Sequence, residues 1–407
     1  MSNWQRWFAI PLSTRWAICV WIVLLLGVFG RVAVARPTAQ SVVPVYLMAG
    51  ERWWNGEPLY APPPPGLDVY RNPPGFAAFF APLSQLPPKP VAILWRLINI
   101  GLFALGLRRF LAAVNPVSLP PRAEAMVWIV AAFLVLPAFN NGQANLPLVA
   151  FALLGTAAAV RGHWWQASVW LMFATCMKVY PIALAGLLLL LAPRRLIGRL
   201  PLVLLVFLAA PFACQHPGYV LEQTFEFGHA TDADERSDAP LERTLKGWTY
   251  PVRVWTGECV PEEAMHASIL ISGLALAGLV GFAARRNGIS PPLFGLVLCL
   301  ALLWMALFGP ATEMNTYSIL APVGWLLVMP HPPRFGRLFA GIGLGLLVIA
   351  VLRGTIPNDP DYTLASVQPI GALLLLGAGV SAVLKTPHAV AAPTRGEYDT
   401  LTESPRV

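Results

Sequence analysis

Apolar runs separated by short polar breaks follow one another along almost the whole chain. The first run, residues 16–35, is long enough to cross a bilayer, because a helix needs about 20 apolar residues to span the hydrocarbon core. Further crossings are expected at 91–107, 125–139, 146–160, 164–177, 182–192, 200–213, 265–284, 291–308, 317–329, 339–352 and 362–384. Because helices satisfy their own backbone hydrogen bonds in lipid, the pattern predicts an all-α polytopic membrane bundle of about twelve transmembrane helices.

Two polar breaks interrupt a series of runs, between residues 125 and 192, that are shorter than the usual spanning length. One is the string NNGQAN at 140–145, and the other is Lys178. Two crossings separate them, so both are expected on the same side of the membrane. Polar side chains at membrane depth commonly line a cavity or a substrate path. An ordinary turn and a lysine that snorkels to the headgroups would give the same pattern, so both interpretations stay open.

Composition excludes a soluble protein, because 57% of the residues are hydrophobic and only 12% are charged. We expect a cytoplasmic N-terminus at 1–15, a single transmembrane domain at 16–385 and a disordered cytoplasmic tail at 386–407. The net charge of +8 does not indicate a nucleic-acid partner, since the basic residues are scattered at the ends of apolar runs. The expected surroundings are membrane lipids.

Basic pairs at 108/109, 194/195 and 285/286 orient the bundle, because Lys and Arg gather on the cytoplasmic side of membrane proteins. The chain is therefore predicted to be a multi-pass protein of the cell (plasma or inner) membrane with both termini cytoplasmic. Two long outer loops, 36–90 and 214–264, then face the periplasm or the exterior. The first is rich in aromatic residues, which predicts interfacial helices near 42–55 and 76–86.

The polar residues predicted on the outer face have the chemistry of transfer from a lipid-linked phosphate donor. Cations such as Lys178 and Arg71 would hold the phosphate, amides would bind sugar hydroxyls, and a carboxylate would take the acceptor's proton. The sugar- or acceptor-binding candidates are Asn141, Gln143, Asn145, Tyr180 and Asn315. Arg96, inside a crossing, is expected to pair within the bundle. The histidines lie far apart, so no metal site and no cofactor are expected.

Six strings in order carry a resemblance to a known family. They are VYLMAGERWWNGEPLY (45–60), VYRNPPGFAAFFAPLSQLP (69–87), ILWRLIN (93–99), NNGQANLPLVAFALLG (140–155), KVYPIAL (178–184) and GPATEMNTY (309–317). Together they resemble glycosyltransferase family 87 over about residues 15–330. The resemblance implies a C-type integral membrane enzyme that transfers mannose from a polyprenyl-phosphate donor on the outer face, with inversion at the anomeric carbon.

The sequence departs from the family at two places. The family's Asp early in the first outer loop, taken as the general base, is replaced by the segment Ser41 to Pro44, and its His-containing motif is replaced by ATEMNT. Glu313 is therefore the first candidate for the base, with Glu51 and Asp68 behind it.

The expected function is a hexosyltransferase that moves a mannose-like sugar from a polyprenyl-phosphate donor to a lipid or glycan acceptor. Two alternatives remain: a transporter or flippase of lipid-linked sugars, and an inactive relative that binds a glycolipid.

Overall fold

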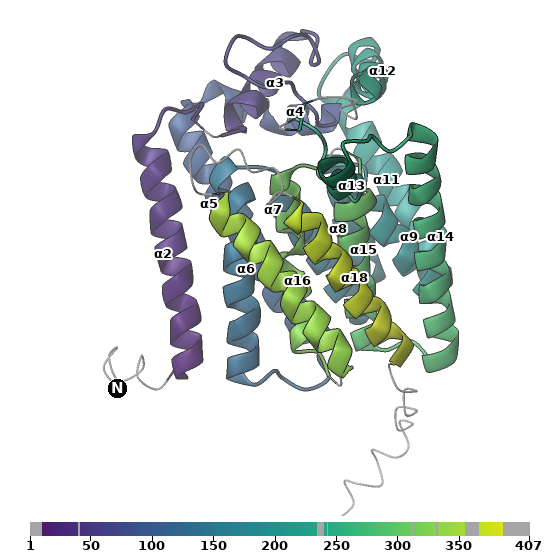
Figure 1. The fold of residues 1–407 in the computed structure, drawn as a ribbon. Helices are drawn as coiled ribbons and strands as arrows, with labels where there is room; N and C mark the ends of the chain where they lie inside the picture. The colour runs from purple at the N-terminus through teal and green to yellow at the C-terminus, as the bar shows by residue number, and fades with distance from the viewer. Residues whose placement is uncertain are drawn as a thin grey trace, which may run out of the picture.

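The computed structural model describes residues 10–39, 41–233, 240–241, 243–310, 312–330, 333–354 and 366–385. Within these ranges every regular element is a helix, and the long helices stand side by side in one bundle (Figure 1). The predicted all-α architecture is therefore confirmed. The first nine residues, positions 362–365 of the last predicted crossing and the tail at 386–407 lie outside the described residues.

Among the described residues, eight helical segments are long and apolar enough to cross a membrane. They are α2 (Leu12–Val34), α5 (Pro88–Val114), α6 (Pro121–Asn141), α14 (Glu262–Asn287), α15 (Pro291–Phe308), α16 (Arg334–Arg353), α18 (Val367–Lys385) and the run Pro193–Ala213, which joins α10 (Pro193–Leu196), α11 (Arg199–Ala209) and η2 (Ala210–Ala213). The remaining predicted crossings coincide with shorter segments, α7 (Asn145–Val160), α8 (Trp164–Met177), α9 (Ile182–Leu191) and the 3₁₀ helix η3 (Met314–Leu327). Each of the predicted runs thus corresponds to a helical segment.

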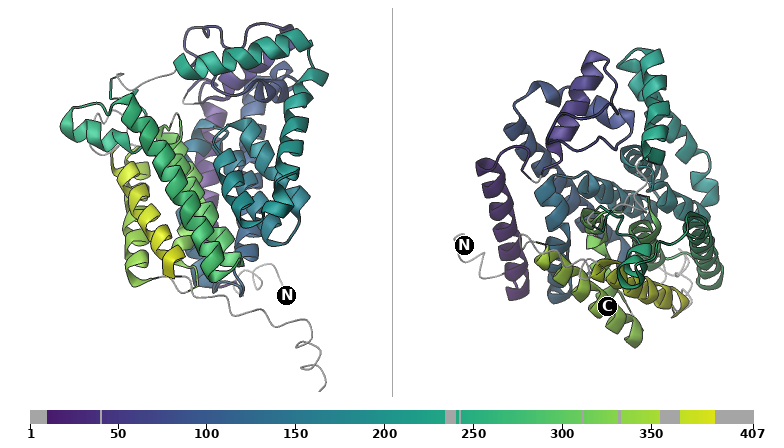
Figure 2. Two further views of the ribbon diagram at one scale, coloured as in Figure 1. Left: turned by 90° about the vertical axis from the view of Figure 1, so that its right-hand side faces the viewer. Right: turned by 45° about the horizontal axis from the view of Figure 1, so that its top comes forward.

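Short helices cover one end of the bundle, opposite the end at which α2 begins and α18 finishes (Figures 1 and 2). The first outer loop supplies α3 (Val43–Asn55), α4 (Pro74–Phe80) and η1 (Leu83–Gln85), as the sequence predicts. A proline in the first turn and Gly56 after the last, with φ of 71°, set the limits of α3. The second outer loop was expected as a loop but contains α12 (Pro217–Ala233) and α13 (Thr249–Thr256).

Several predicted helix ends were wrong, as in α14, which continues to Asn287 although its end was expected at residue 284. Residues 108 and 109 were expected to end a crossing, but α5 continues to Val114. Both arginines are exposed on the helix, so their charged groups can reach the headgroup region without ending it. At the other end of the bundle α6 extends beyond the predicted residue 139 and includes Asn140 and Asn141 as its last residues.

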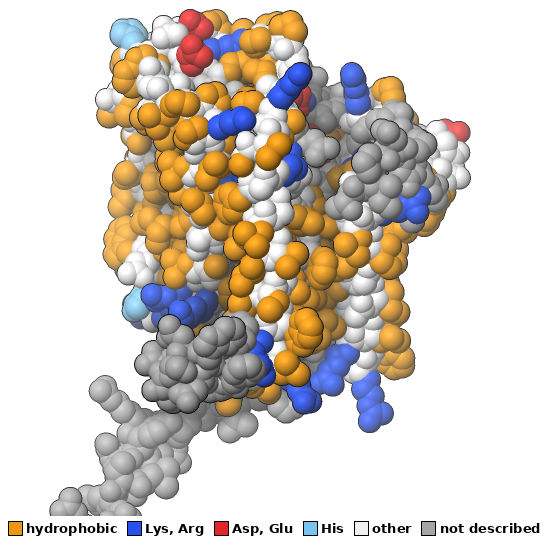
Figure 3. Space-filling view, turned by 90° about the vertical axis from the view of Figure 1, so that its left-hand side faces the viewer, with side chains coloured by type: hydrophobic (Ala, Val, Ile, Leu, Met, Phe, Trp, Pro, Cys, Tyr) orange, Lys and Arg blue, Asp and Glu red, His pale blue; other side chains and the backbone are white. Residues whose placement is uncertain are grey.

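The core of the bundle is formed by α7 and α15, whereas α2 is peripheral. The apolar window of α15 is 78% buried and that of α2 only 17%. On the face where α2 lies, apolar side chains cover the middle of the molecule and Lys and Arg gather toward its two ends (Figure 3). This distribution is the one expected of a surface in contact with lipid.

Candidate active site

The string NNGQAN forms a tight turn between α6 and α7, which we call the amide turn (residues 140–145). Gly142 follows the last residue of α6 with φ of 77°, and the backbone N–H groups of Gly142 and Gln143 both donate to Ala138 O, at 2.8 and 3.0 Å. This is the closure typical of a helix that ends in a left-handed glycine. A Cβ atom at position 142 would lie 2.8 Å from Val43 Cγ2, so only glycine fits.

A network of side-chain hydrogen bonds joins the amide turn to Lys178 and to the start of η3. The Lys178 Nζ donates to Asn145 Oδ1 at 2.9 Å. The Nδ2 of Asn145 donates in turn to Gln143 Oε1 at 2.8 Å and to Asn315 O at 3.1 Å. Asn145 is fully buried. The structure therefore brings together four of the residues singled out in the sequence, from three separate connections.

The surroundings of Lys178 disfavour the charged form of its ammonium in part. Burial lowers the pKa of Lys178 to about 8, and the Arg71 cation acts in the same direction. The Glu313 carboxylate opposes this shift. The Tyr180 ring lies 5.8 Å from the ammonium. The Lys178 side chain is still partly exposed, so an anionic ligand can reach it. Such a ligand would stabilise the charged ammonium, which burial disfavours.

Two buried polar atoms beside this network have no hydrogen-bond partner within the described part of the chain. They are Asn141 Oδ1 and the hydroxyl of Tyr180. Burial raises the pKa of the Tyr180 phenol above its ordinary value, so it stays protonated and can donate. An unmade hydrogen bond costs about 1–3 kcal/mol, and such atoms usually bind water or a ligand. Both atoms therefore keep an unused hydrogen-bonding capacity beneath the surface of the site.

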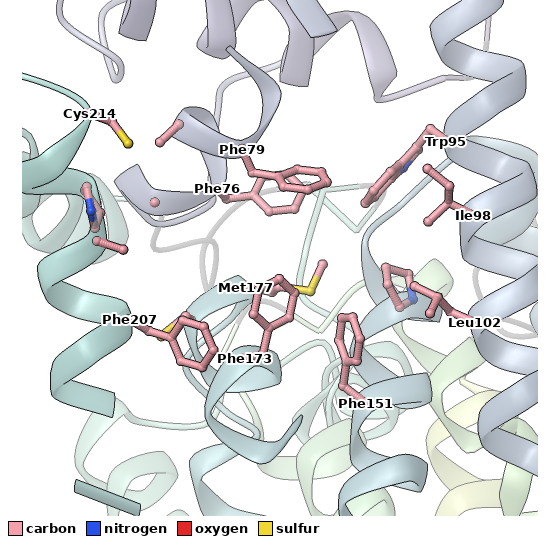
Figure 4. A pocket seen from close by; sticks show the side chains of 16 residues that line it. Phe76, Phe79, Trp95, Ile98, Leu102, Phe151, Phe173, Met177, Phe207 and Cys214 are labelled. Carbon is pink, nitrogen blue, oxygen red and sulfur yellow. The ribbon is translucent and has the colours of Figure 1, made fainter. Parts of the chain in front are cut away.

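An apolar cavity of about 450 Å³ lies in the bundle, and Met177, the residue before Lys178, is among those that line it (Figure 4). Aromatic rings surround it, Phe76 and Phe79 from α4 on one side and Phe151 and Phe173 from α7 and α8 on the other. Its other lining residues are Gly75, Ala78, Trp95, Ile98, Leu102, Pro147, Cys176, Phe207, Ala210, Pro211 and Cys214. The lining does not include Lys178, so the cation and the cavity are neighbours along the chain through Met177.

The candidate acids differ in their surroundings. Glu313 is the N-cap of η3 and forms a capping box with Thr316, whose hydroxyl accepts from the Glu313 N–H at 3.1 Å. Asp68 is 65% exposed and lies 2.7 Å from Arg71 Nη1. Glu51 is exposed on α3. Of the three, only Glu313 acts electrostatically on Lys178 and on the buried Tyr46.

The sequence did not reveal the cavity or the residues that brace the amide turn. Tyr46 accepts the Ala144 N–H at 3.3 Å through its hydroxyl, and Asn72 donates to Met177 O at 3.3 Å. Tyr46 reads in the sequence as an interfacial aromatic residue and Asn72 as a loop residue. Their contacts depend on how α3 and the first outer loop fold over the bundle.

The fold and the site define a polytopic membrane protein with a buried polar network at one end of its helical bundle. Residues 70–330 match glycosyltransferase family 87. The chain therefore belongs to glycosyltransferase family 87 and is a membrane glycosyltransferase. No curated protein matches the chain significantly.

One solved structure with some likeness is ArnT from Cupriavidus metallidurans bound to undecaprenyl phosphate. It is 15% identical, over 91% of this chain and 77% of that chain, with a TM-score of 0.33. At that score the likeness carries no argument about the site.

Proposed function

We propose that the protein transfers a hexose, mannose-like in shape, from a polyprenyl-phosphate sugar to a lipid or glycan acceptor at the membrane's outer face. The observation that carries this proposal is that the polar network and the apolar cavity adjoin along the chain. Lys178, partly exposed and bonded to Asn145, directly follows Met177, which lines the apolar cavity. A long apolar chain that ends in a phosphate is the ligand that satisfies both parts at once.

The cavity suits the first isoprene units of the donor. Because such a tail arrives from lipid, which is as apolar as the cavity, little hydrophobic driving force is gained on entry. The aromatic lining supplies shape and dispersion contacts instead. Affinity and orientation therefore come mainly from the headgroup.

The headgroup meets two cations and several amides. Lys178 supplies a point charge for the phosphate, and Arg71, already close enough to lower the pKa of Lys178, supplies a second. Asn141 Oδ1 and the Tyr180 hydroxyl, which have no hydrogen-bond partner among the described residues, would bind sugar hydroxyls once a side-chain movement exposes them. Gln143, Asn145 and the backbone of Asn315 form the wall behind them.

In the reaction the acceptor hydroxyl attacks the anomeric carbon while the bond from that carbon to the phosphate oxygen breaks. Glu313 takes the hydroxyl proton, and Lys178 and Arg71 stabilise the polyprenyl phosphate that leaves. A single displacement of this kind inverts the anomeric configuration. Glu313 takes the role that the family's first-loop acid has elsewhere, since residues 41–44 contain no acid.

The outer side is assigned from charge. The basic residues at 194/195 and 285/286 lie at helix ends away from the amide turn, and such residues favour the cytoplasmic side. Transport is less well supported than transfer, because transporters hold their substrates near the middle of the membrane. Here the polar residues sit at the ends of α6 and α8 and at the start of α7.

The direct test is a transfer assay with the purified protein in nanodiscs and radiolabelled polyprenyl-phosphate hexoses, scored by release of polyprenyl phosphate in the presence of membrane-lipid acceptors. Wild type should release it, whereas Glu313→Gln and Lys178→Met should not. Equal turnover in all three proteins would remove this site. Passage of the intact donor across liposome membranes without release would instead support the transporter.

A further inference from the structure

Arg96, in the first half of α5, is a fully buried cation whose partners are three backbone carbonyls and the Ser41 hydroxyl. Its Nε donates to Phe139 O at 3.1 Å, and its Nη2 donates to Asn140 O at 2.7 Å and to Ser41 Oγ at 3.2 Å. Its Nη1 donates to Ala92 O at 3.0 Å. The ion pairs found among the described residues do not include Arg96. Its charge therefore faces the carbonyl end of α6, where the helix dipole is negative.

Neighbouring groups hold the rest of the amide turn in the same way. Trp95 donates through Nε1 to Gly142 O at 2.8 Å, and the Val42 N–H donates to Asn141 O at 3.0 Å. Arg31 of α2 donates to both oxygens of Asn140, at 2.6 and 2.7 Å. Each carbonyl from residue 139 to residue 142 thus has a partner outside α6. The backbone of the turn is fixed from three sides.

This bracing matters for the site because the next residues carry it. Asn145 stands three positions after Gly142 and accepts the hydrogen bond from the Lys178 ammonium. A shift of the turn would move Asn145 Oδ1 away from Lys178, although neither Arg96 nor Arg31 contacts Lys178 in the hydrogen bonds described. We infer that Arg96 is a positioning residue, which acts through the amide turn and Asn145 to hold the Lys178 ammonium in place. This inference rests on the proposed function, in which Lys178 binds the donor phosphate.

A purely structural role for Arg96 predicts something different. Loss of a buried guanidinium lowers stability wherever it lies, because the carbonyls it bonded lose their partner. Such a loss would reduce the amount of folded protein without changing the ligand affinity of the protein that remains. A positioning role instead changes affinity, changes its pH dependence and depends on Asn145.

The test measures the affinity of a polyprenyl phosphate for the full-length protein in nanodiscs between pH 6.5 and 9.5. The variants are Arg96→Lys, Asn145→Ala, the double variant and Lys178→Met. The matched control is Asn115→Ala, which removes a buried amide at the far end of the same helix, where it bonds Trp325 Nε1 at 3.0 Å. Where Arg96→Lys fails to reach the membrane, Arg31→Lys probes the same Asn140 carbonyl.

Arg96→Lys should weaken binding about 10-fold at pH 7.5, the loss expected for one charge-assisted hydrogen bond. In the Asn145→Ala background the same change should cost less than about 2-fold, because the two residues act in series. The fall in affinity at high pH should begin at lower pH, since the ammonium loses an acceptor that favours its charged form. Glu313, Arg71 and Tyr180, the other groups that face Lys178, are unchanged in every variant.

The outcomes separate the inference from the proposed function. If Asn145→Ala and Lys178→Met both bind like wild type, the proposed site is wrong. If those two variants lose affinity while Arg96→Lys matches Asn115→Ala, with an unshifted pH profile and additive effects, the positioning role is overturned. A non-additive loss together with a shifted profile supports it.

Discussion

Two sets of polar residues lie at the same end of the bundle and differ in how they are held. In the amide turn Asn145 is fully buried, bonds three partners and fixes Lys178. In the first outer loop Asp68 is 65% exposed and pairs at the surface with Arg71, and Glu51 is exposed as well. Buried, fully bonded groups are preorganised, whereas exposed ion pairs contribute about 0–1 kcal/mol. Function should therefore depend on Asn145 and Lys178 far more than on Asp68 and Glu51.

The largest expected effect is that of Glu313→Gln. Removing a general base should lower kcat about 10³-fold in the transfer assay. Glutamine can still accept the backbone hydrogen bond of the capping box, so the folded protein should keep its abundance. Thr316→Ala is the matched control, because it breaks the other half of the capping box and keeps the carboxylate. An equal loss of kcat in both variants would assign Glu313 a capping role alone.

Lys178→Met should lower kcat/KM about 10²-fold, since a preorganised charge on the leaving phosphate is lost. Methionine fills a similar volume, and the orphaned Asn145 Oδ1 can turn to water. Lys89→Met is the control, because Lys89 is exposed at the start of α5 and contacts only Ala33 O, at 3.3 Å, in the hydrogen bonds described. Similar rates for the two variants would contradict the assignment of Lys178.

Binding of a polyprenyl phosphate should weaken as pH rises. The pKa of Lys178 is about 8, so the ammonium is charged below that pH and loses its proton above it. Affinity should therefore be constant from about pH 7 to 7.5 and fall by about tenfold by pH 9. Glu313→Gln removes the carboxylate that raises this pKa, so its profile should shift to lower pH. Titration of binding in nanodiscs measures both curves; a flat profile to pH 9.5 would mean that Lys178 is not the phosphate ligand.

The smallest effects are expected in the first outer loop. Glu51→Gln and Asp68→Asn should each change kcat/KM by less than about 2-fold, because the groups removed are exposed. The same transfer assay measures both. A loss of kcat/KM of about 10²-fold or more, the size expected for Lys178→Met, would mean that the first outer loop carries the catalytic residues.

The parts of the fold that could be predicted are those set by local signals. The sequence marks the ends of two helices. Prolines begin the helix Pro291–Phe308, and a glycine follows the helix Val43–Asn55. The end of α5 could not be predicted, because exposed arginines are compatible with both a helix end and a helix interior. Likewise α12 lies in a polar stretch without an apolar run, so the sequence does not indicate this helix. Its packing on the first outer loop accounts for it: Gln223 Oε1, for example, accepts from the Leu59 N–H at 2.7 Å.

For the site, counting crossings was enough to predict that the amide turn and Lys178 share one side, and the structure joins them by a hydrogen bond. Arg96 was expected to pair within the bundle, and its partners proved to be carbonyls of the amide turn. The cavity could not be foreseen, because its lining comes from α4, α5, α7, α8 and residues 207–214. In the sequence, none of those aromatic residues can be distinguished from an ordinary lipid-facing or core residue.

The most direct test of the central claim is photo-cross-linking with a polyprenyl phosphate that carries a diazirine on its first isoprene units. Mass spectrometry should locate the label on cavity residues such as Phe79, Trp95 or Phe173. Unlabelled polyprenyl phosphate should compete with it, and Lys178→Met should abolish it. Label on the lipid-facing surfaces of α2 or α14, unchanged by competitor and by the Lys178 variant, would contradict the account.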